Sequence, residues 1–319
     1  MWEKFEGNGF FAFSDPAGAK ACLALNEILG IEKVPGQRKL FSNKEYSFYT
    51  QFESVVNIVS IEKIETITEE FDWIFTGTSH PESSSGFELQ ILNNIVAKNS
   101  FSFIDHWTNF KLRFTLNDKL ILPAVIFVVD EKAKEIAIQE GLPEKDLIVF
   151  ENPYLIYLKN YKKTNISRES FCKKLNICSA KKNILYAPDP ISIRSRDVRN
   201  EVEILEELID ICNNTSYNLL IKLHPLQPLE VIGKIIDSHD NLVLIDDKLF
   251  LPHEIFGNVD CIIGFYSNYL LEASTMNKNI VRYLVSNKQI DYLEHSLQSS
   301  SEIVYNKKEL NFAIKKACA

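Results

Sequence analysis

The sequence predicts an α/β protein with two domains, each a parallel sheet covered by helices on both faces. Apolar runs of four to eight residues alternate with stretches of helical periodicity, a pattern typical of βαβ units. The 319 residues suit two domains of roughly 100–200 residues each. A basic, polar stretch from Tyr154 to Lys182 separates two such alternating sets. We therefore expect Rossmann-like domains over 1–160 and 183–319, joined by a linker over 161–182, with a central cleft between them.

In the first half, residues 10–14 form an apolar run that ends in the turn Asp15-Pro16-Ala17-Gly18. Pro and Gly favour a turn, so a strand followed by a helix is expected there. The periodicity over 87–98 predicts an amphipathic helix after the turn-rich loop 76–86. The other expected strands are 55–59, 73–75, 102–104, 125–129 and 147–150, and the other expected helices are 19–29 and 131–140.

The second half repeats the pattern. Residues 183–187 form an apolar run that ends at Pro188-Asp189-Pro190, and residues 199–213 have the periodicity of a long helix. The other expected strands are 219–223, 242–245, 261–264 and 280–283, and the other expected helices are 254–257 and 269–276.

Composition excludes several classes of protein. With 45% hydrophobic and 24% charged residues the chain is neither disordered nor a coiled coil, and a net charge of −8 argues against nucleic acid as a partner. The longest apolar run, 120–129, is too short to span a bilayer, and residues 1–11 lack the pattern of a secretory signal. The six scattered cysteines suit reduced thiols, so we expect a cytoplasmic protein. The basic stretch 159–182 is interpreted as a solvated linker, with peripheral contact at the inner face of the membrane as the alternative.

Ligands of open α/β sheets bind at the carboxyl ends of the strands, so polar residues that follow a strand are candidates. His224 and Pro225 follow the strand expected over 219–223. The imidazole can donate to a phosphate oxygen, or can simply cap a turn. Pro188 and Asp189 follow the strand expected over 183–187, where Asp189 either faces the ligand or organises its own turn.

Ser267 and Asn268 stand at the start of the helix expected over 269–276. Backbone N–H groups, a hydroxyl and the helix dipole together form an anion site, and simple N-capping is compatible with that role. Glu272, one turn further on, is placed to accept ribose hydroxyls or is an ordinary surface charge.

The first half offers candidate bases. Asp105 and His106 follow the strand expected over 102–104, and a carboxylate desolvated beside Trp107 would have a raised pKa suited to a general base. Asp15, in the first strand–helix turn, is the alternative base. Arg113 either pairs with an anionic substrate or lies on a solvated helix face. The serine-rich stretch 83–86 is either a mobile loop over the cleft or a linker.

Several known motifs are absent from the sequence. It contains no GxGxxG, no GxxxxGK[ST], no DxD pair, no GxSxG and no HExxH. We therefore expect a mechanism without a metal and without a bound cofactor.

Two parts of the chain resemble a known class of enzyme. Residues 123–153 resemble the end of the N-terminal domain of GT-B glycosyltransferases. The segments NILYAPDP, IKLHP and VDCIIGFYSNYLLEASTMNKNIVRYL resemble the nucleotide-binding domain of bacterial capsule and lipopolysaccharide transferases. Sialyltransferase-like and polysialyltransferase-like enzymes, which use CMP-sugars, are the most similar. CDP-glycerol-dependent polymerases share the KxHP segment and the serine-containing turn.

This resemblance implies roles for particular residues. His224 and Pro225 match the HP motif that contacts CMP, and Ser267 and Asn268 match the turn that holds the phosphate. Asp105 is the best positional match to the acidic base, although the second acid and the glycine of that motif are absent.

The resemblance also implies a reaction. It is an inverting, metal-independent transfer of a sugar, of the nonulosonate or Kdo type, from a nucleotide-sugar donor to a glycan or glycolipid acceptor. Because the chain is acidic, the cleft should be locally basic, with Lys222, Arg194 and Arg196 as candidate cations. The alternatives are a CDP-glycerol-type glycerophosphotransferase, a UDP-sugar 2-epimerase-like enzyme and a degenerate, non-catalytic GT-B module.

Overall fold

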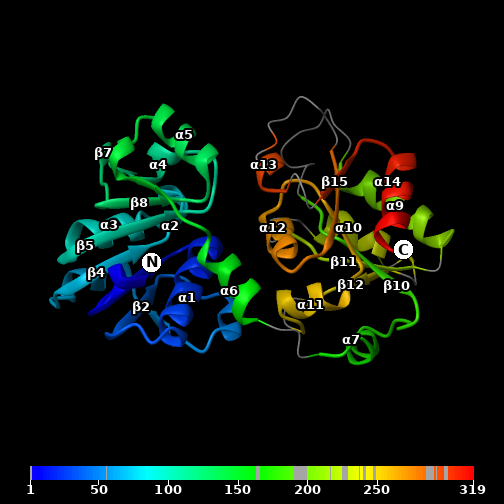
Figure 1. Ribbon diagram of the computed structural model, residues 1–319, viewed down its shortest axis with the longest axis horizontal. Helices are drawn as coiled ribbons and strands as arrows, with labels where there is room; N and C mark the ends of the chain where they lie inside the picture. The colour runs from blue at the N-terminus through cyan, green and yellow to red at the C-terminus, as the bar shows by residue number, and fades with distance from the viewer. Residues whose placement is uncertain are drawn as a thin grey trace. The chain divides into compact units, whose positions relative to one another are not determined.

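Two parallel β-sheets form the cores of two units of the chain, which comprise Met1–Asn160 and Tyr161–Ala319 in the computed structural model (Figure 1). The structure describes residues 2–54, 56–162, 166–189, 200–215, 217–224, 229–236, 238–239, 242–246, 249–284, 291, 293–297 and 301–319. Each unit is described by itself below.

The first sheet has the order β3-β2-β1-β4-β5-β8-β9 within the described residues, and all its strand pairs are parallel. Its strands are β1 (Gly9–Phe13), β2 (Arg38–Ser42), β3 (Asn57–Ile58), β4 (Phe71–Thr76), β5 (Ala97–Ile104), β8 (Val125–Val128) and β9 (Leu147–Val149). A short antiparallel hairpin is formed by β6 (Thr115–Leu116) and β7 (Lys119–Leu120). The helices are η1 (Trp2–Phe5), α1 (Pro16–Ile31), η2 (Ser47–Gln51), η3 (Ile61–Thr66), α2 (Pro81–Ser84), α3 (Phe87–Asn94), α4 (Phe110–Arg113), α5 (Glu131–Gln139), η4 (Glu144–Asp146) and α6 (Pro153–Tyr161).

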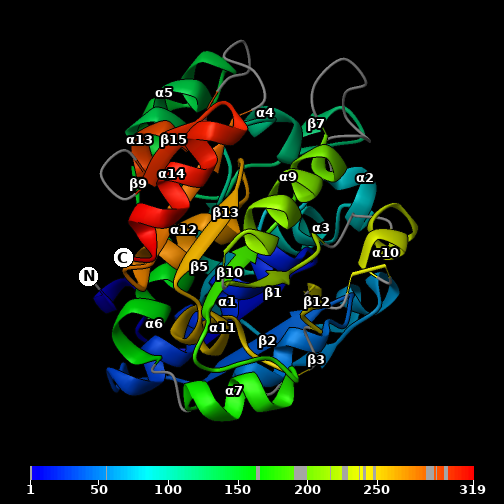
Figure 2. The same ribbon diagram turned by 90° about the vertical axis from the view of Figure 1, so that its right-hand side faces the viewer.

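The second sheet has the order β12-β11-β10-β13-β14-β15 and is likewise parallel (Figure 2). Its strands are β10 (Lys182–Tyr186), β11 (Tyr217–Ile221), β12 (Leu242–Leu244), β13 (Cys261–Gly264), β14 (Asn279–Tyr283) and β15 (Ser301–Val304). The helices are α7 (Arg168–Lys174), α9 (Glu201–Asn213), α10 (Leu229–Ile236), α11 (Pro252–Asn258), α12 (Asn268–Thr275), α13 (Glu294–Leu297) and α14 (Lys307–Ala317).

Both sheets reverse their strand order at one point. In the first, β1 lies between β2 and β4, and in the second, β10 lies between β11 and β13. This is the doubly wound order of Rossmann-like folds, which bind ligands at the carboxyl ends of the strands beside the reversal. The predicted α/β fold with two Rossmann-like halves is confirmed.

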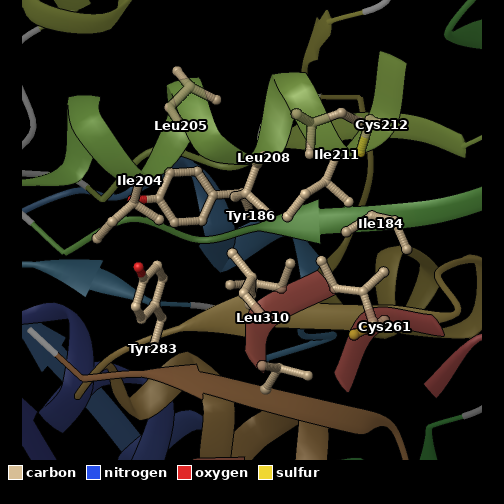
Figure 3. Packing of buried hydrophobic residues seen from close by; sticks show 14 of the residues in the cluster. Ile184, Tyr186, Ile204, Leu205, Leu208, Ile211, Cys212, Cys261, Tyr283 and Leu310 are labelled. Atoms are coloured by element: carbon tan, nitrogen blue, oxygen red, sulfur yellow. The ribbon is translucent and has the colours of Figure 1, made fainter. Parts of the chain in front are cut away.

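The core of the second unit explains why its strands read as continuous apolar runs. Side chains of α9 and α14 pack on alternate residues of β10, β13 and β14, among them Ile184, Tyr186, Cys261 and Tyr283 (Figure 3). Residues of the opposite alternation, such as Leu185 and Ile262, are also fully buried. The sheet is therefore covered on both faces, as parallel sheets require.

The core of the first unit is aromatic. Phe5 makes edge contacts with Trp73 and Phe75, and Phe101 stacks on Phe127 with ring centroids 5.5 Å apart. Offset and edge-on contacts of this kind add to the free energy gained by burying the rings.

Several elements differ from the sequence prediction. The helix expected over 87–98 ends at Asn94, because residues 97–104 form strand β5, whose first half is polar and partly exposed. Strand β2 begins with Arg38 and Lys39 and was not expected, and only Asn57–Ile58 of the strand expected over 55–59 is a strand. The serine-rich stretch 83–86 belongs to α2 and to the left-handed turn that ends it. The segment expected as a linker contains α7, whose Phe171 and Cys172 are buried.

The final strand and helix, β15 and α14, were also not expected. Asn306 caps α14 by accepting a hydrogen bond from Glu309 N. Among the described helices, none combines the length and the apolar character needed to cross a bilayer.

Candidate functional site

The strand reversal of the first unit lies beside Asp15. This residue follows β1 and caps α1, because its Oδ1 accepts a hydrogen bond from Gly18 N at 2.6 Å. Gly77 follows β4, the strand next to β1, and a Cβ atom on Gly77 would lie 2.8 Å from Gly18 Cα. The two glycines therefore allow the start of α1 to pack directly against the end of β4. Asp15 is fixed at the place where this fold binds ligands.

A second carboxylate, Asp105, lies near Asp15. It follows β5 and is buried. The pKa of Asp15 is raised to about 6, first by burial and then by the negative charge of Asp105, and against the effect of the Gly18 amide and the Arg113 guanidinium. Two carboxylates in one partly desolvated place disfavour simultaneous ionisation. The structure thus brings together the two bases named from the sequence.

Arg113 anchors this acidic site. Its Nη1 donates to the carbonyl oxygen of Thr78, and its Nε donates to that of Thr108 at 3.4 Å. The side chain is only partly exposed, so Arg113 does not lie on a fully solvated helix face. Its positive charge lowers the pKa of Asp15.

Glu88 is a third carboxylate, and the sequence analysis missed it. The residue is 3% exposed in the first turn of α3, and its Oε2 accepts a hydrogen bond from Ser79 Oγ at 2.6 Å. Burial and the charge of Asp15 raise the pKa of Glu88 to about 7. Thr78, Ser79, Glu88 and Arg113 line one narrow pocket of this unit. The only sequence signal was an acid directly after Gly86-Phe87, on the apolar face of a helix.

The residues after Asp105 do not join the carboxylates. His106 is exposed, and its Nδ1 accepts a hydrogen bond from Trp107 N at 3.1 Å. Trp107 is buried and donates its indole N–H to Asp130 Oδ2 at 2.9 Å. Asp130 also caps α5, so Trp107 ties two elements together.

In the second unit, the strand reversal lies between β10 and β13. Pro188 and Asp189 follow β10 and are both buried. The Oδ2 atom of Asp189 accepts a hydrogen bond from Tyr266 N, in the turn after β13, at 3.1 Å. Asp189 therefore does more than organise its own turn, because it connects the two loops that flank the reversal.

The turn after β13 leads into α12. Ser267 caps this helix, since its Oγ accepts a hydrogen bond from Tyr269 N at 3.3 Å. Asn268 is the first helical residue, and Glu272 is buried one turn further on. Glu272 is therefore not an ordinary surface charge. The N-terminus of α12 carries a partial positive charge at this edge of the sheet.

The end of β11 lies at the same edge. Lys222 and His224 follow this strand and are partly exposed. The Lys222 ammonium lies 5.5 Å from the centroid of the Tyr269 ring, which links the β11 loop to α12. Pro225, Arg194 and Arg196, also named from the sequence, lie outside the described residues.

A buried cation that the sequence analysis did not name adjoins the same turn. Arg282 lies in β14 and is 0% exposed. Its Nε donates to the carbonyl oxygen of Phe265 at 3.1 Å, and its Nη2 pairs with Asp291. In the sequence it stands inside the apolar run IVRYL, where a charge is costly to bury.

Among the residues that the structure describes, no group of three or more His, Cys, Asp and Glu side chains is arranged to hold a metal ion. The first unit has an acidic site, and in the second unit Lys222 and Arg282 contact the turn and the helix that follow β13.

Comparison with known proteins finds a family match within the second unit. Residues 192–286 match the family model described as alpha-2,8-polysialyltransferase. This range contains His224, Ser267, Asn268, Glu272 and Arg282. A search of curated proteins returned no significant match.

Solved structures with the same fold include sugar-nucleotide enzymes. The S. aureus MnaA–UDP complex has a TM-score of 0.70 at 16% identity, covering 97% of this chain and 87% of that one. UDP-GlcNAc 2-epimerase from Methanocaldococcus jannaschii, in complex with UDP-GlcNAc and UDP, has a TM-score of 0.68 at 13% identity, with 98% and 92% covered. The wall teichoic acid polymerase TagF with CDPG has a TM-score of 0.58 at 14% identity, with 96% and 78% covered.

The chain therefore has the GT-B fold, with two Rossmann-like domains. The family match confirms the resemblance to polysialyltransferases that its sequence motifs indicate. Fold and family match together support a glycosyltransferase, and at these low identities the solved structures by themselves establish only the fold.

Proposed function

We propose that the chain is an inverting, metal-independent glycosyltransferase that moves an acidic sugar from a CMP-activated donor onto a surface-polysaccharide or lipooligosaccharide acceptor. One observation carries this proposal. The polysialyltransferase match over 192–286 covers the end of β11, the turn after β13, helix α12 and β14, which are the elements that surround the second strand reversal. The family resemblance and the expected ligand position of the fold coincide there.

We assign binding of the nucleotide-sugar donor to the second unit. His224 and the N-terminus of α12, with Ser267 and Asn268, would stabilise the charge that develops on the leaving phosphate. Asp189 and Pro188 would shape the loop beside it, and Glu272 would accept ribose hydroxyls. Pro225 completes the proposed nucleotide site on sequence grounds.

We assign binding and deprotonation of the acceptor to the first unit. A carboxylate accepts the proton of the acceptor hydroxyl, whose oxygen bonds to the anomeric carbon while the bond from that carbon to the phosphate oxygen breaks. CMP leaves with the electron pair. Either Asp105 or Asp15 can serve as this base. The geometry favours Asp15, because it is partly exposed at the strand reversal and its pKa of about 6 lies near neutral pH. Asp105 would then act by raising that pKa.

A nucleotide panel tests the donor assignment. Thermal unfolding is followed with CMP, CDP, UMP, UDP, GDP and ADP, because a ligand at a hundredfold excess over its Kd stabilises a protein by about 2.7 kcal/mol. We expect CMP to stabilise the chain most and His224→Ala to abolish the effect. His239→Ala is the matched control, since His239 precedes β12 and so lies at the opposite edge of the sheet.

The other outcomes of the panel point to other functions. Selective stabilisation by CDP would favour a glycerophosphotransferase, and stabilisation by UDP would favour an epimerase or a UDP-sugar transferase. No response to any nucleotide would favour a non-catalytic module. If CMP binds, turnover of a CMP-sugar that persists in the presence of a chelator would confirm independence from metal.

A further inference from the structure

Two buried hydrogen-bond donors adjoin the turn Phe265–Tyr266, and the fold leaves both unused. In the described part of the chain, Arg282 Nη1 and the Tyr266 hydroxyl are both buried and have no hydrogen-bond partner. The two side chains are neighbours, with the guanidinium carbon 5.9 Å from the centroid of the Tyr266 ring. Buried donors are almost always satisfied in folded proteins, so two adjacent exceptions need an explanation.

The remaining contacts of Arg282 fix its position. Nε is held by the Phe265 carbonyl oxygen and Nη2 by Asp291, so the guanidinium plane is anchored on two sides and a third nitrogen is left over. Arginine is the residue best suited to bind an oxyanion through several N–H groups in one plane. The carboxylate of Asp291 accepts a hydrogen bond from only one of the two terminal nitrogens of Arg282.

Tyr266 is anchored as well. Its backbone N–H donates to Asp189 Oδ2 at 3.1 Å, and the next residue, Ser267, caps α12. Burial raises the pKa of the Tyr266 hydroxyl to about 12, so the hydroxyl remains a donor at neutral pH. A helix N-terminus, a guanidinium nitrogen and a phenol thus meet in one turn, and all three favour negative charge.

We propose that Arg282 and Tyr266 bind an oxyanion of the donor, with Arg282 Nη1 and the Tyr266 hydroxyl each donating to one of its oxygens. This inference rests on the proposed function in that it assigns the oxyanion to a nucleotide sugar. A nucleotide phosphate and the carboxylate of an acidic sugar offer the same acceptor chemistry.

Tyr266→Phe is the decisive variant, because it removes only the hydroxyl. A buried hydroxyl without a partner loses its hydration and gains no hydrogen bond on folding, so its removal should leave thermal stability without ligand unchanged or higher. Affinity for the bound oxyanion should fall about tenfold, the loss of one hydrogen bond to a charged group. Tyr217→Phe, at the opposite end of β11, is the matched control and should change neither.

Isothermal titration calorimetry with four probes separates the sources of the oxyanion: CMP, cytidine, inorganic phosphate and free N-acetylneuraminate. Weaker binding of CMP and phosphate to Tyr266→Phe and Arg282→Lys, with cytidine unaffected, would assign the pair to the phosphate. Weaker binding of N-acetylneuraminate alone would assign it to the sugar carboxylate.

Two results would overturn the inference. One is unchanged binding of every probe by Tyr266→Phe, and the other is a wild-type chain that binds no oxyanion at all. If inorganic phosphate binds and depends on Tyr266 while no nucleotide binds, the oxyanion site stands and the proposed donor fails.

Discussion

Asp189 and Tyr266 are 77 residues apart in the sequence, and one hydrogen bond of 3.1 Å joins the carboxylate of the first to the backbone N–H of the second. The bond bridges the loops that follow β10 and β13, the two strands at which the order of the second sheet reverses. The turn that leads into α12 is therefore held by an acid from one neighbouring strand and, through Phe265, by Arg282 from the other.

This relationship predicts that Asp189→Ala destabilises the protein by about 1–3 kcal/mol, because a backbone N–H loses its buried acceptor. Asp189→Asn retains an acceptor oxygen and should cost less. The measurement is the free energy of unfolding in urea. Glu206→Ala, on the exposed face of α9, is the control and should stay within about 0.5 kcal/mol of wild type. Equal stability of Asp189→Ala and wild type would show that the bond does not hold the turn.

The contact between Gly18 and Gly77 gives a second prediction. Gly77→Ala should destabilise the first unit by about 1–3 kcal/mol, because its Cβ would lie 2.8 Å from Gly18 Cα and the backbone must move. Gly30→Ala is the control, since Gly30 also lies in this unit's α1 but is exposed, and a Cβ there meets nothing closer than Arg38 Nη2 at 3.8 Å. That variant should be neutral or more stable by about 0.5–1 kcal/mol. The measurement is thermal unfolding of both variants. Similar melting temperatures would contradict the prediction that the contact with Gly18 makes Gly77→Ala the less stable variant.

The sequence predicts those strands well whose side chains are buried on both faces of the sheet. Strands such as β10 and β13, covered on both faces, are continuous apolar runs and are found within a residue or two. Strand β2 begins with Arg38 and Lys39, and β5 begins with a polar, partly exposed segment that continues the pattern of α3. Periodicity cannot separate such a strand from its neighbours, because only tertiary pairing fixes it.

The candidate sites show the same limit. Asp15, Asp105 and Ser267 follow strands, so the rule for parallel sheets locates them without a structure. Glu88 lies in the first turn of a helix and Arg282 lies inside a strand, and because neither residue directly follows a strand, that rule does not point to them. Their partners, Ser79 for Glu88 and Phe265 for Arg282, are known only once the chain has folded.

A third prediction follows from the burial of Glu88. Its pKa is 4.5 in the unfolded reference and about 7 in the folded state, so folding favours the protonated form. The contribution of Glu88 to the free energy of unfolding is highest below pH 4.5, falls as pH rises from 4.5 to 7, and stays at its lowest value above pH 7. Glu88→Gln still accepts the Ser79 hydrogen bond without a charge. It should therefore be more stable than wild type at pH 8 by on the order of 3 kcal/mol, and equal to it at pH 4.

The control for Glu88→Gln is Glu82→Gln, whose side chain is 91% exposed and should change stability little at either pH. Urea unfolding at pH 4, 6 and 8 gives the comparison. A stabilisation of Glu88→Gln that does not depend on pH would mean that the carboxyl group stays in one protonation state across this range.

The last prediction concerns the base. If Asp15 accepts the acceptor's proton, it must be ionised, so kcat/KM should fall as pH drops below about 6, the pKa of its carboxyl group. Asp15→Asn should lose about 10²–10⁴-fold in kcat at all pH values. Asp105→Asn should instead keep much of the activity and shift the acid limb to lower pH, because the negative charge that raises the pKa of Asp15 is gone. Measuring kcat/KM between pH 4.5 and 8.5 for the three proteins separates the two residues. A complete loss of activity in Asp105→Asn, with an unshifted limb in Asp15→Asn, would assign the base to Asp105.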